Sequence, residues 1–171
     1  MTKTVAESFT IMTEMIMPND TNPLGNLFGG NLLRFMDTAG SICAGRHCEA
    51  YVVTASVDHV SFTEPIHLGE VITLECSVTR SWTTSVEVFV EVWAADVRGK
   101  NRHKCNHAYF TFVGLDAYTK KPTPVPAVAI SGDDQQLRYD AAERRREVRL
   151  VLAGRMKPSE AFNLKAFFGE D

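Results

Sequence analysis

Apolar residues at helical spacing dominate residues 28–49, a stretch that has two glycines at its start and no proline. On a helical wheel these residues cover more than half of the circumference. An apolar sector this wide does not suit a helix with one side in water. The pattern predicts a long helix wrapped on several sides by a curved sheet. The apolar positions are Leu32, Leu33, Phe35, Met36, Ala39, Gly40, Ile42, Cys43 and Ala44.

The narrow polar sector of this helix holds Arg34, Thr38 and Ser41, with Asp37 at its border. A carboxylate is ionised at neutral pH and can accept a proton from water in a transition state. Asp37 is therefore a candidate general base. The alternative is a structural pair with Arg34, which lies three positions earlier on the same face.

Strand-like patterns occupy most of the remaining chain up to residue 115. Residues 8–17 suit a first strand, and a turn-rich loop over residues 18–25 leads into the helix. Four further strands are expected at residues 51–62, 71–82, 85–95 and 104–115. Within residues 85–95, four valines alternate with Glu87, Phe89, Glu91 and Trp93, which is typical of an antiparallel strand with one covered face. The element order predicts an α+β domain, with one sheet around one helix and a C-terminal helix beyond it.

Three prolines, at positions 122, 124 and 126, interrupt the strand pattern. Helical spacing returns at residues 133–153, and the tail from Gly154 has little pattern. We therefore expect a domain at residues 1–126 and a helical extension at residues 127–171.

Composition narrows the class of protein. The 171 residues carry a net charge of −3, which gives no support to a role in binding nucleic acid or a membrane surface. Glu7 and Glu14 interrupt the first 17 residues, so no signal peptide is expected, and no apolar stretch approaches the ~20 residues of a membrane helix. The four cysteines form no CxxC pair, which suits a reducing compartment. We expect a cytoplasmic protein.

Two glycines at the start of the long helix form a second candidate site. Glycine lets a ligand approach the backbone closely, and free N–H groups at a helix N-terminus favour negative charge. Gly29 and Gly30 are thus candidates for binding an oxyanion. A glycine-rich helix start without a ligand explains them equally well.

Two further motifs have weaker readings. His103, Cys105 and His107 alternate along a predicted strand, so they are expected on one face. Their tips would lie ~6–7 Å apart, which favours a partly exposed strand face over a zinc site. The arginine run at residues 144–146 is either a solvated face paired with Glu143 and Glu147 or a phosphate clamp. The chain has no GxSxG, P-loop or GxGxxG motif.

Taken together, five segments resemble the hotdog-fold acyl-CoA thioesterases of the cytosolic acyl-CoA hydrolase type. They are MPNDTNPLGNLFGG, LLRFMDTAG, RHC, VVTASVDHVSFTEPIHLGE and TTSVEVFVEVW, in family order within residues 8–116. The resemblance implies a curved antiparallel sheet around one helix. It also implies hydrolysis of fatty acyl-CoA to fatty acid and coenzyme A, without a metal or redox cofactor. The implied assembly is a homodimer at minimum, with a trimer of dimers (a homohexamer) common in the group.

The resemblance also assigns roles to residues. It implies that Asp37 activates water, either as general base or as nucleophile through a mixed anhydride. It places Asn22 of the partner subunit across from Asp37, and it assigns the oxyanion site to the backbone N–H groups of Gly29 and Gly30. The residues implied to bind coenzyme A are Ala55, Ser56, Val57, Thr84, Ser85, Arg145 and Arg146.

Two rival functions remain within the fold. Hotdog enoyl-CoA hydratases carry an Asp-x-Asn-Pro-x-His loop, and here Gly25 follows Asp20-Thr21-Asn22-Pro23-Leu24 where the histidine would stand. A protein that senses acyl-CoA without cleaving it would not need the carboxylate of Asp37. The sequence leaves open the acyl chain length, the physiological substrate and regulation by coenzyme A or nucleotides.

Overall fold

The computed structural model describes residues 1–169 and divides the chain into two compact units, Met1–Ala129 and Ile130–Asp171. The short strand β7 (Ala127–Ala129) belongs to the first unit because it pairs in parallel with β1 (Thr2–Thr4). The boundary between the units therefore lies between residues 129 and 130. The sequence predicts a domain boundary between residues 126 and 127.

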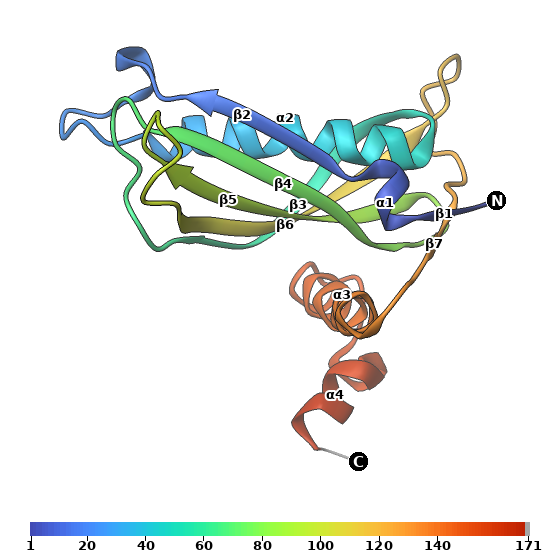
Figure 1. Ribbon diagram of the computed structural model, residues 1–171. Coiled ribbons are helices and arrows are strands. Elements are labelled where there is room, and N and C mark those ends of the chain that lie inside the picture. The colour runs from blue at the N-terminus through green and yellow to red at the C-terminus, as the bar shows by residue number, and fades with distance from the viewer. Residues whose placement is uncertain (170–171) are drawn as a thin grey trace. The chain divides into compact units, whose positions relative to one another are not determined.

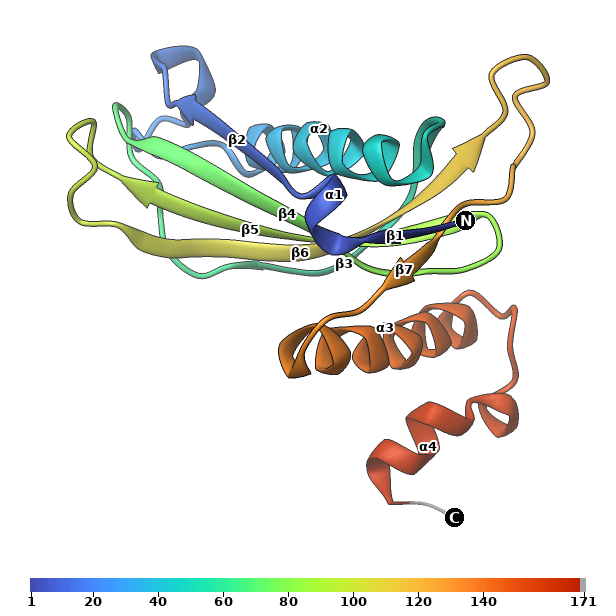
Figure 2. The ribbon, with the colours of Figure 1, turned by 45° about the vertical axis from the view of Figure 1, so that its right-hand side comes forward.

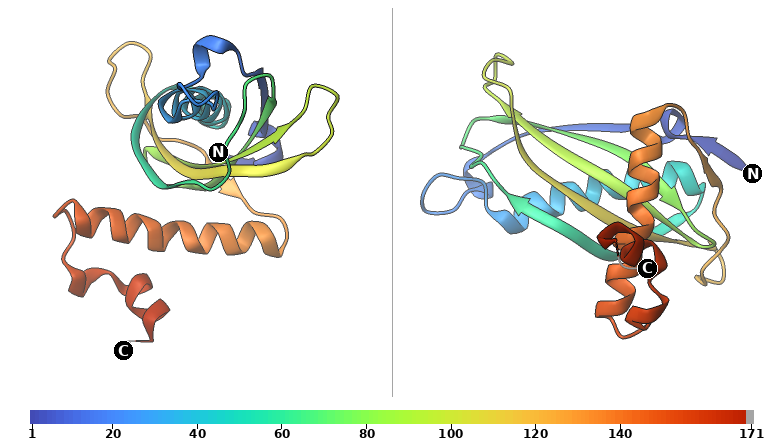
Figure 3. Two further views of the ribbon diagram at one scale, coloured as in Figure 1. Left: turned by 90° about the vertical axis from the view of Figure 1, so that its left-hand side faces the viewer. Right: turned by 90° about the horizontal axis from the view of Figure 1, so that it is seen from below.

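The first unit is built on an antiparallel five-stranded sheet that curves around one long helix (Figure 1). The end-on view in Figure 3 shows helix α2 (Gly29–Cys48) lying in the hollow of this sheet. In spatial order the strands are β2 (Thr10–Met15), β4 (Val71–Ser81), β5 (Ser85–Ala95), β6 (His103–Leu115) and β3 (Tyr51–Phe62). Strands β2 and β3 are the two edges. The predicted α+β arrangement of sheet and helix is confirmed.

The face of the sheet that covers α2 is apolar, as the alternation in β5 predicts. Val86, Val88, Val90 and Val92 are fully buried. Gly40 on α2 makes the close approach possible, because a Cβ there would lie 3.1 Å from the ring of Phe112. Apolar burial of this kind is the main source of stability in a domain of this size.

The C-terminal end of α2 is tied to both ends of the first unit. The Lys3 ammonium donates a hydrogen bond to the Arg46 carbonyl at 2.8 Å and pairs with Glu49 at 2.6 Å. A cation at this end of a helix is favourable because the last carbonyls are partly negative. His47 is buried, and its Nε2 lies 3.1 Å from the carbonyl oxygen of Pro126. This contact holds the proline-rich segment at residues 122–126 against the helix.

The structure adds elements that the sequence pattern does not reveal. Residues Val5–Ser8 form the helical turn α1, so the predicted strand at residues 8–17 begins only at Thr10. A 3-10 turn, η1 (Pro18–Asp20), lies within the predicted loop. Glu7 explains the turn, because its carboxylate accepts hydrogen bonds from the N–H and hydroxyl of Thr4.

The second unit consists of α3 (Asp133–Leu152), the 3-10 turn η2 (Pro158–Glu160) and α4 (Phe162–Phe168), seen in Figure 2. The Glu147 carboxylate of α3 accepts hydrogen bonds from the N–H groups of Asn163 and Leu164, at 3.2 and 2.7 Å, and from the Asn163 amide at 2.7 Å. This side chain therefore caps α4 and fixes it against α3. None of the described helices is long and apolar enough to span a membrane.

Candidate active site

Asp37 lies on the third turn of α2, half-buried, and faces the edge strand β3. The Thr54 hydroxyl of β3 donates a hydrogen bond to Asp37 Oδ1 at 2.5 Å. The predicted alternative of a pair with Arg34 is not observed, since the described residues include no ion pair between the two. The Arg34 guanidinium instead lies 4.4 Å from the centre of the Phe35 ring. A helix and a strand thus fix the carboxylate together, and one oxygen remains open to a further donor.

Thr54 is a functional candidate that the sequence reading missed. It belongs to an alternating run, where one threonine resembles any other polar position. Its role depends on the contact between α2 and β3, which no local pattern reveals. The structure shows its orientation through the strand register, since Thr54 lies opposite the inward-facing Phe112.

Asn22 shapes the loop before α2. Its Oδ1 accepts hydrogen bonds from the N–H groups of Leu24 and Asn26, at 3.0 and 3.2 Å, and its carbonyl accepts one from Gly25 at 2.9 Å. Within the described residues its Nδ2 donates to no acceptor, so this group is free to face a substrate. Gly25 has φ of +77°, a conformation in which a histidine side chain would be strained.

Gly29 and Gly30 are the first two residues of α2. The helical hydrogen bonds begin with the N–H groups of Asn31 and Leu32, which donate to the Phe28 carbonyl at 2.9 and 3.0 Å. The N–H groups of both glycines therefore precede this ladder and are free to donate outward. A Cβ on Gly30 would lie 3.0 Å from the Phe28 ring, so glycine keeps the approach to these donors open.

A pocket of about 390 Å³ opens beside the start of α2. Asn22 and Gly29 line it together with apolar side chains, among them Leu32 and Phe62. Asp37 lies eight residues along the helix from Gly29, which is about 12 Å at the helical rise. Within one chain the structure thus brings Asn22 and the glycines together and leaves Asp37 apart from them.

The residues predicted to bind coenzyme A fall into three places. Ala55, Ser56 and Val57 lie in β3, where a shift in the register between Thr54 and Ser56 makes Ala55 a bulge residue. Such a bulge re-aims the neighbouring side chains at a sheet edge.

The other predicted contacts with coenzyme A lie away from this edge. Ser85 begins β5, next to Thr84 in the turn, and is separated from β3 by strand β6, about 10 Å across the sheet. Arg145 and Arg146 lie on α3 in the second unit. Arg145 donates a hydrogen bond to the Arg138 carbonyl at 3.3 Å, and Arg146 lies 3.9 Å from Glu143. The roles of all seven residues stay predictions.

The predicted common face of His103, Cys105 and His107 is wrong. Cys105 is an extra residue in β6, because Lys104 lies opposite Trp93 while the next pair joins Asn106 to Val92. His103 and His107 consequently lie opposite Ala94 and Glu91, on different faces of the sheet. Among the described residues, no group of three or more histidine, cysteine, aspartate or glutamate side chains is placed to hold a metal ion.

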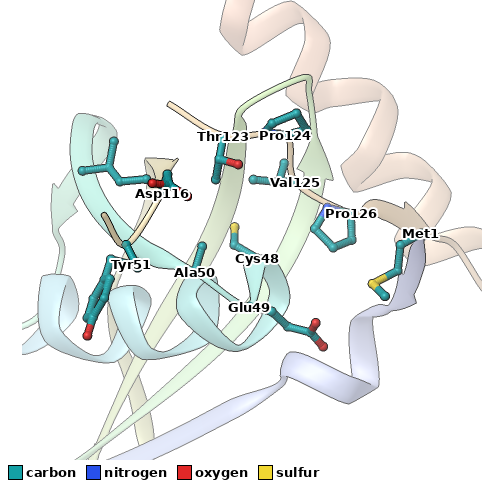
Figure 4. A pocket seen from close by; sticks show the side chains of 12 residues that line it. Met1, Cys48, Glu49, Ala50, Tyr51, Asp116, Thr123, Pro124, Val125 and Pro126 are labelled. Atoms are coloured by element: carbon teal, nitrogen blue, oxygen red, sulfur yellow. The ribbon is translucent and has the colours of Figure 1, made fainter. Parts of the chain in front are cut away.

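A larger cavity, of about 700 Å³, lies at the other end of α2 (Figure 4). Its two carboxylates are already engaged, Glu49 with Lys3 and Asp116 with the N–H groups of Tyr118 and Thr119. Hydrogen bonds from Thr119 hold the pKa of Asp116 below its ordinary value. Burial raises the pKa of the Cys48 thiol to about 11, so it is no nucleophile at neutral pH. The predicted site residues do not line this cavity.

Comparison with known proteins identifies the family. The thioesterase superfamily model matches residues 24–100. The acyl-CoA thioester hydrolase YkhA of Bacillus subtilis, itself uncharacterised, is 38% identical over 144 residues, which cover 84% of this chain and 83% of that protein. The cytosolic acyl coenzyme A thioester hydrolase of Rattus norvegicus is 33% identical and is matched over 38% of its length.

Solved structures agree with this assignment. An apo-hexameric acyl-CoA thioesterase superposes with a TM-score of 0.84 at 35% identity, over 89% of this chain and 97% of that one. A Staphylococcus aureus acyl-CoA hydrolase, in complex with butyryl coenzyme A, coenzyme A and coenzyme A disulfide, gives 0.82 at 34% identity, over 97% and 99%. With its sheet wrapped around α2, this chain belongs to the hotdog-fold thioesterase superfamily, among the acyl-CoA thioester hydrolases.

Proposed function

We propose that this protein hydrolyses acyl-CoA thioesters to a free carboxylic acid and coenzyme A, at a site shared by two copies of the chain. The observation that carries the proposal is the pair formed by Asp37 and Thr54, a carboxylate held on one side and open on the other. Relatives over most of this chain are named acyl-CoA thioester hydrolases, and one solved neighbour holds butyryl coenzyme A.

The chemistry follows from the groups at each end of the site. The N–H groups of Gly29 and Gly30 bind the thioester oxygen as negative charge develops on it. Asp37 Oδ1 is occupied by Thr54, so Oδ2 accepts the proton of the attacking water. The carbon–sulfur bond then breaks and coenzyme A leaves as a thiolate, which needs neither a metal nor a redox cofactor.

A shared site is supported by the separation of these groups and by the exposed edge β3. Tyr51, Val53, Val57 and Phe62 on this edge are 40–67% exposed. An unpaired edge with exposed apolar residues favours pairing with a second copy. Antiparallel pairing of two β3 edges sets the Thr54 end of one strand beside the Phe62 end of the other. That arrangement brings Asp37 of one copy toward Gly29 and Asn22 of its partner.

We propose a dimer as the smallest active form and a trimer of dimers as the full assembly, in a cytoplasmic protein. In this proposal coenzyme A lies along Ala55, Ser56 and Val57 and the turn at Thr84 and Ser85. Its phosphates meet Arg145 and Arg146, since guanidinium groups suit phosphate through paired donors.

Thiol release from short, medium and long acyl-CoAs tests the proposal, with wild type beside Asp37→Asn. We expect release by the wild type and a loss of about 10²-fold or more in the variant at an unchanged melting temperature, because Asn cannot accept the proton. Binding of acyl-CoA without release from any substrate would indicate a sensor. Full turnover by Asp37→Asn with lowered stability would make Asp37 structural.

A further inference from the structure

A buried asparagine lies behind the pocket at the start of α2. Asn106 of β6 is 1% exposed, and both its Oδ1 and its Nδ2 lack a hydrogen-bond partner in the described part of the chain. Buried polar side chains are almost always hydrogen-bonded, and leaving one bare is costly. Asn106 is therefore a candidate for binding a group that the described part of the chain does not supply.

The register shows where this amide is directed. Asn106 lies opposite Val92 on one side and Phe62 on the other. Directly opposite residues in an antiparallel pair project to the same face. Val92 is buried in the core, and Phe62 lies against the start of α2, 3.3 Å from where a Cβ on Gly29 would stand. Asn106 thus lies on the inner face of the sheet next to Phe62, near the start of the helix and behind the residues that line the pocket.

The wall of the pocket is attached to this part of β6. The N–H groups of Thr63 and Glu64, which line the pocket, donate to the Cys105 carbonyl at 3.3 and 3.4 Å. Apolar side chains such as Leu32 and Ile66 line the pocket together with the polar side chains of Asn22 and Asn26. Its volume of about 390 Å³ falls in the lower part of the range for small-molecule sites. The space beside Gly29 hence combines apolar side chains and the Asn22 amide in its lining with the unpaired amide of Asn106 behind it.

We propose that this pocket receives the acyl group, that Asn106 determines specificity there, and that the preferred substrates are hydroxyacyl-CoA thioesters. The proposal rests on the thioesterase function proposed above. A hydroxyl group satisfies both bare atoms of Asn106, since it donates to Oδ1 and accepts from Nδ2. A keto oxygen satisfies only Nδ2, and an alkyl chain satisfies neither. Sites built to bind a hydroxyl reject the analogue that lacks it, because their own polar groups then stay unpaired.

The test measures kcat/KM for hexanoyl-CoA, 3-hydroxyhexanoyl-CoA, 6-hydroxyhexanoyl-CoA and 3-oxohexanoyl-CoA with wild type and Asn106→Val. We expect the wild type to prefer at least one hydroxyacyl substrate over hexanoyl-CoA by about 10-fold or more. Asn106→Val, which removes the bare amide at similar volume, should lose that preference and melt at the same or a higher temperature. Asn106→Leu provides a second apolar variant, in case valine fails to fold.

Three outcomes overturn the proposal. Equal turnover of hexanoyl-CoA and both hydroxyacyl substrates by the wild type removes the specificity. A preference that survives in both apolar variants assigns it to another residue. Higher stability of Asn106→Val with unchanged selectivity makes the amide a site for a buried water only. If no acyl-CoA of any kind is cleaved, the proposed thioesterase function itself is wrong. That result differs from the three outcomes above, in which hexanoyl-CoA or a hydroxyacyl-CoA is still cleaved.

Discussion

At the scale of single residues, the site is built from side chains that each satisfy part of a neighbour and leave one group open. Thr54 occupies one oxygen of Asp37 and leaves the other. Asn22 uses its Oδ1 to hold the turn, and its amide N–H donors have no acceptor in the described part of the chain. Rigid placement of this kind lowers the reorganisation that a reaction would otherwise need.

The hydrogen bond from Thr54 leads to a prediction about kcat. Thr54→Val keeps the shape of the side chain and removes the donor, so Asp37 is free to rotate away from the attacking water. We expect kcat to fall by roughly 10- to 100-fold with a smaller change in KM, and Thr54→Ser to retain most of the activity. Steady-state kinetics with one acyl-CoA measures both variants. Loss of activity in the serine variant with activity retained in the valine variant would show that the methyl group matters and the hydrogen bond does not.

At the scale of elements, the sequence predicts the helices and strands in which buried and exposed residues follow a regular pattern. The strands at residues 51–62 and 85–95 and the helix from Gly29 are found as expected, because alternation and helical spacing record burial directly. The turn α1 and the bulge at Cys105 are missed. The turn α1 follows from a local contact, the hydrogen bonds between Thr4 and Glu7. The bulge depends on pairing with a neighbouring strand, and it shifts every following side chain to the other face without changing the residues in its own strand.

The C-terminal end of α2 gives a prediction about stability and pH. His47 is buried, its Nδ1 has no partner in the described part of the chain, and burial lowers its pKa from the usual value. Lys3, which is nearby, lowers the pKa further, and Glu7 opposes this. The unfolded chain therefore binds a proton on this residue more tightly than the folded chain does. The free energy of unfolding should fall as pH drops below about 6.5, the usual histidine pKa in an unfolded chain, and continue to fall until the folded pKa is reached.

Chemical unfolding between pH 5 and 8 measures this dependence, with His47→Gln as the matched control. Glutamine can still donate to the Pro126 carbonyl but does not titrate, so its curve should be flatter below pH 6.5. The difference between the two proteins isolates His47 from the carboxylates, which titrate in both. Parallel curves would mean that the pKa of His47 is the same in the folded and unfolded chains.

At the scale of the whole molecule, the predicted site residues fall into two groups within one chain. Asn22, Gly29 and Gly30 meet within one chain, as their closeness in sequence suggests. Asp37 does not join them, because a straight helix keeps residues eight positions apart about 12 Å apart. In the proposed function a second copy supplies the missing side, and this depends on the exposed edge β3 rather than on any motif.

A shared site predicts that two inactive variants restore each other. Asp37→Asn removes the base, while Asn22→Asp keeps the oxygen that holds the loop and removes the free amide donors. Each variant alone should lose activity by about 10²-fold. In an equal mixture that is unfolded and refolded together, half of the dimers combine one of each variant, and in those one of the two sites carries neither substitution. Activity should then recover to about a quarter of the wild type, as two-fold symmetry requires. If each chain held a complete site, the mixture would stay at the mean of the two variants. Mixing the two folded variants without unfolding them should restore nothing until subunits exchange.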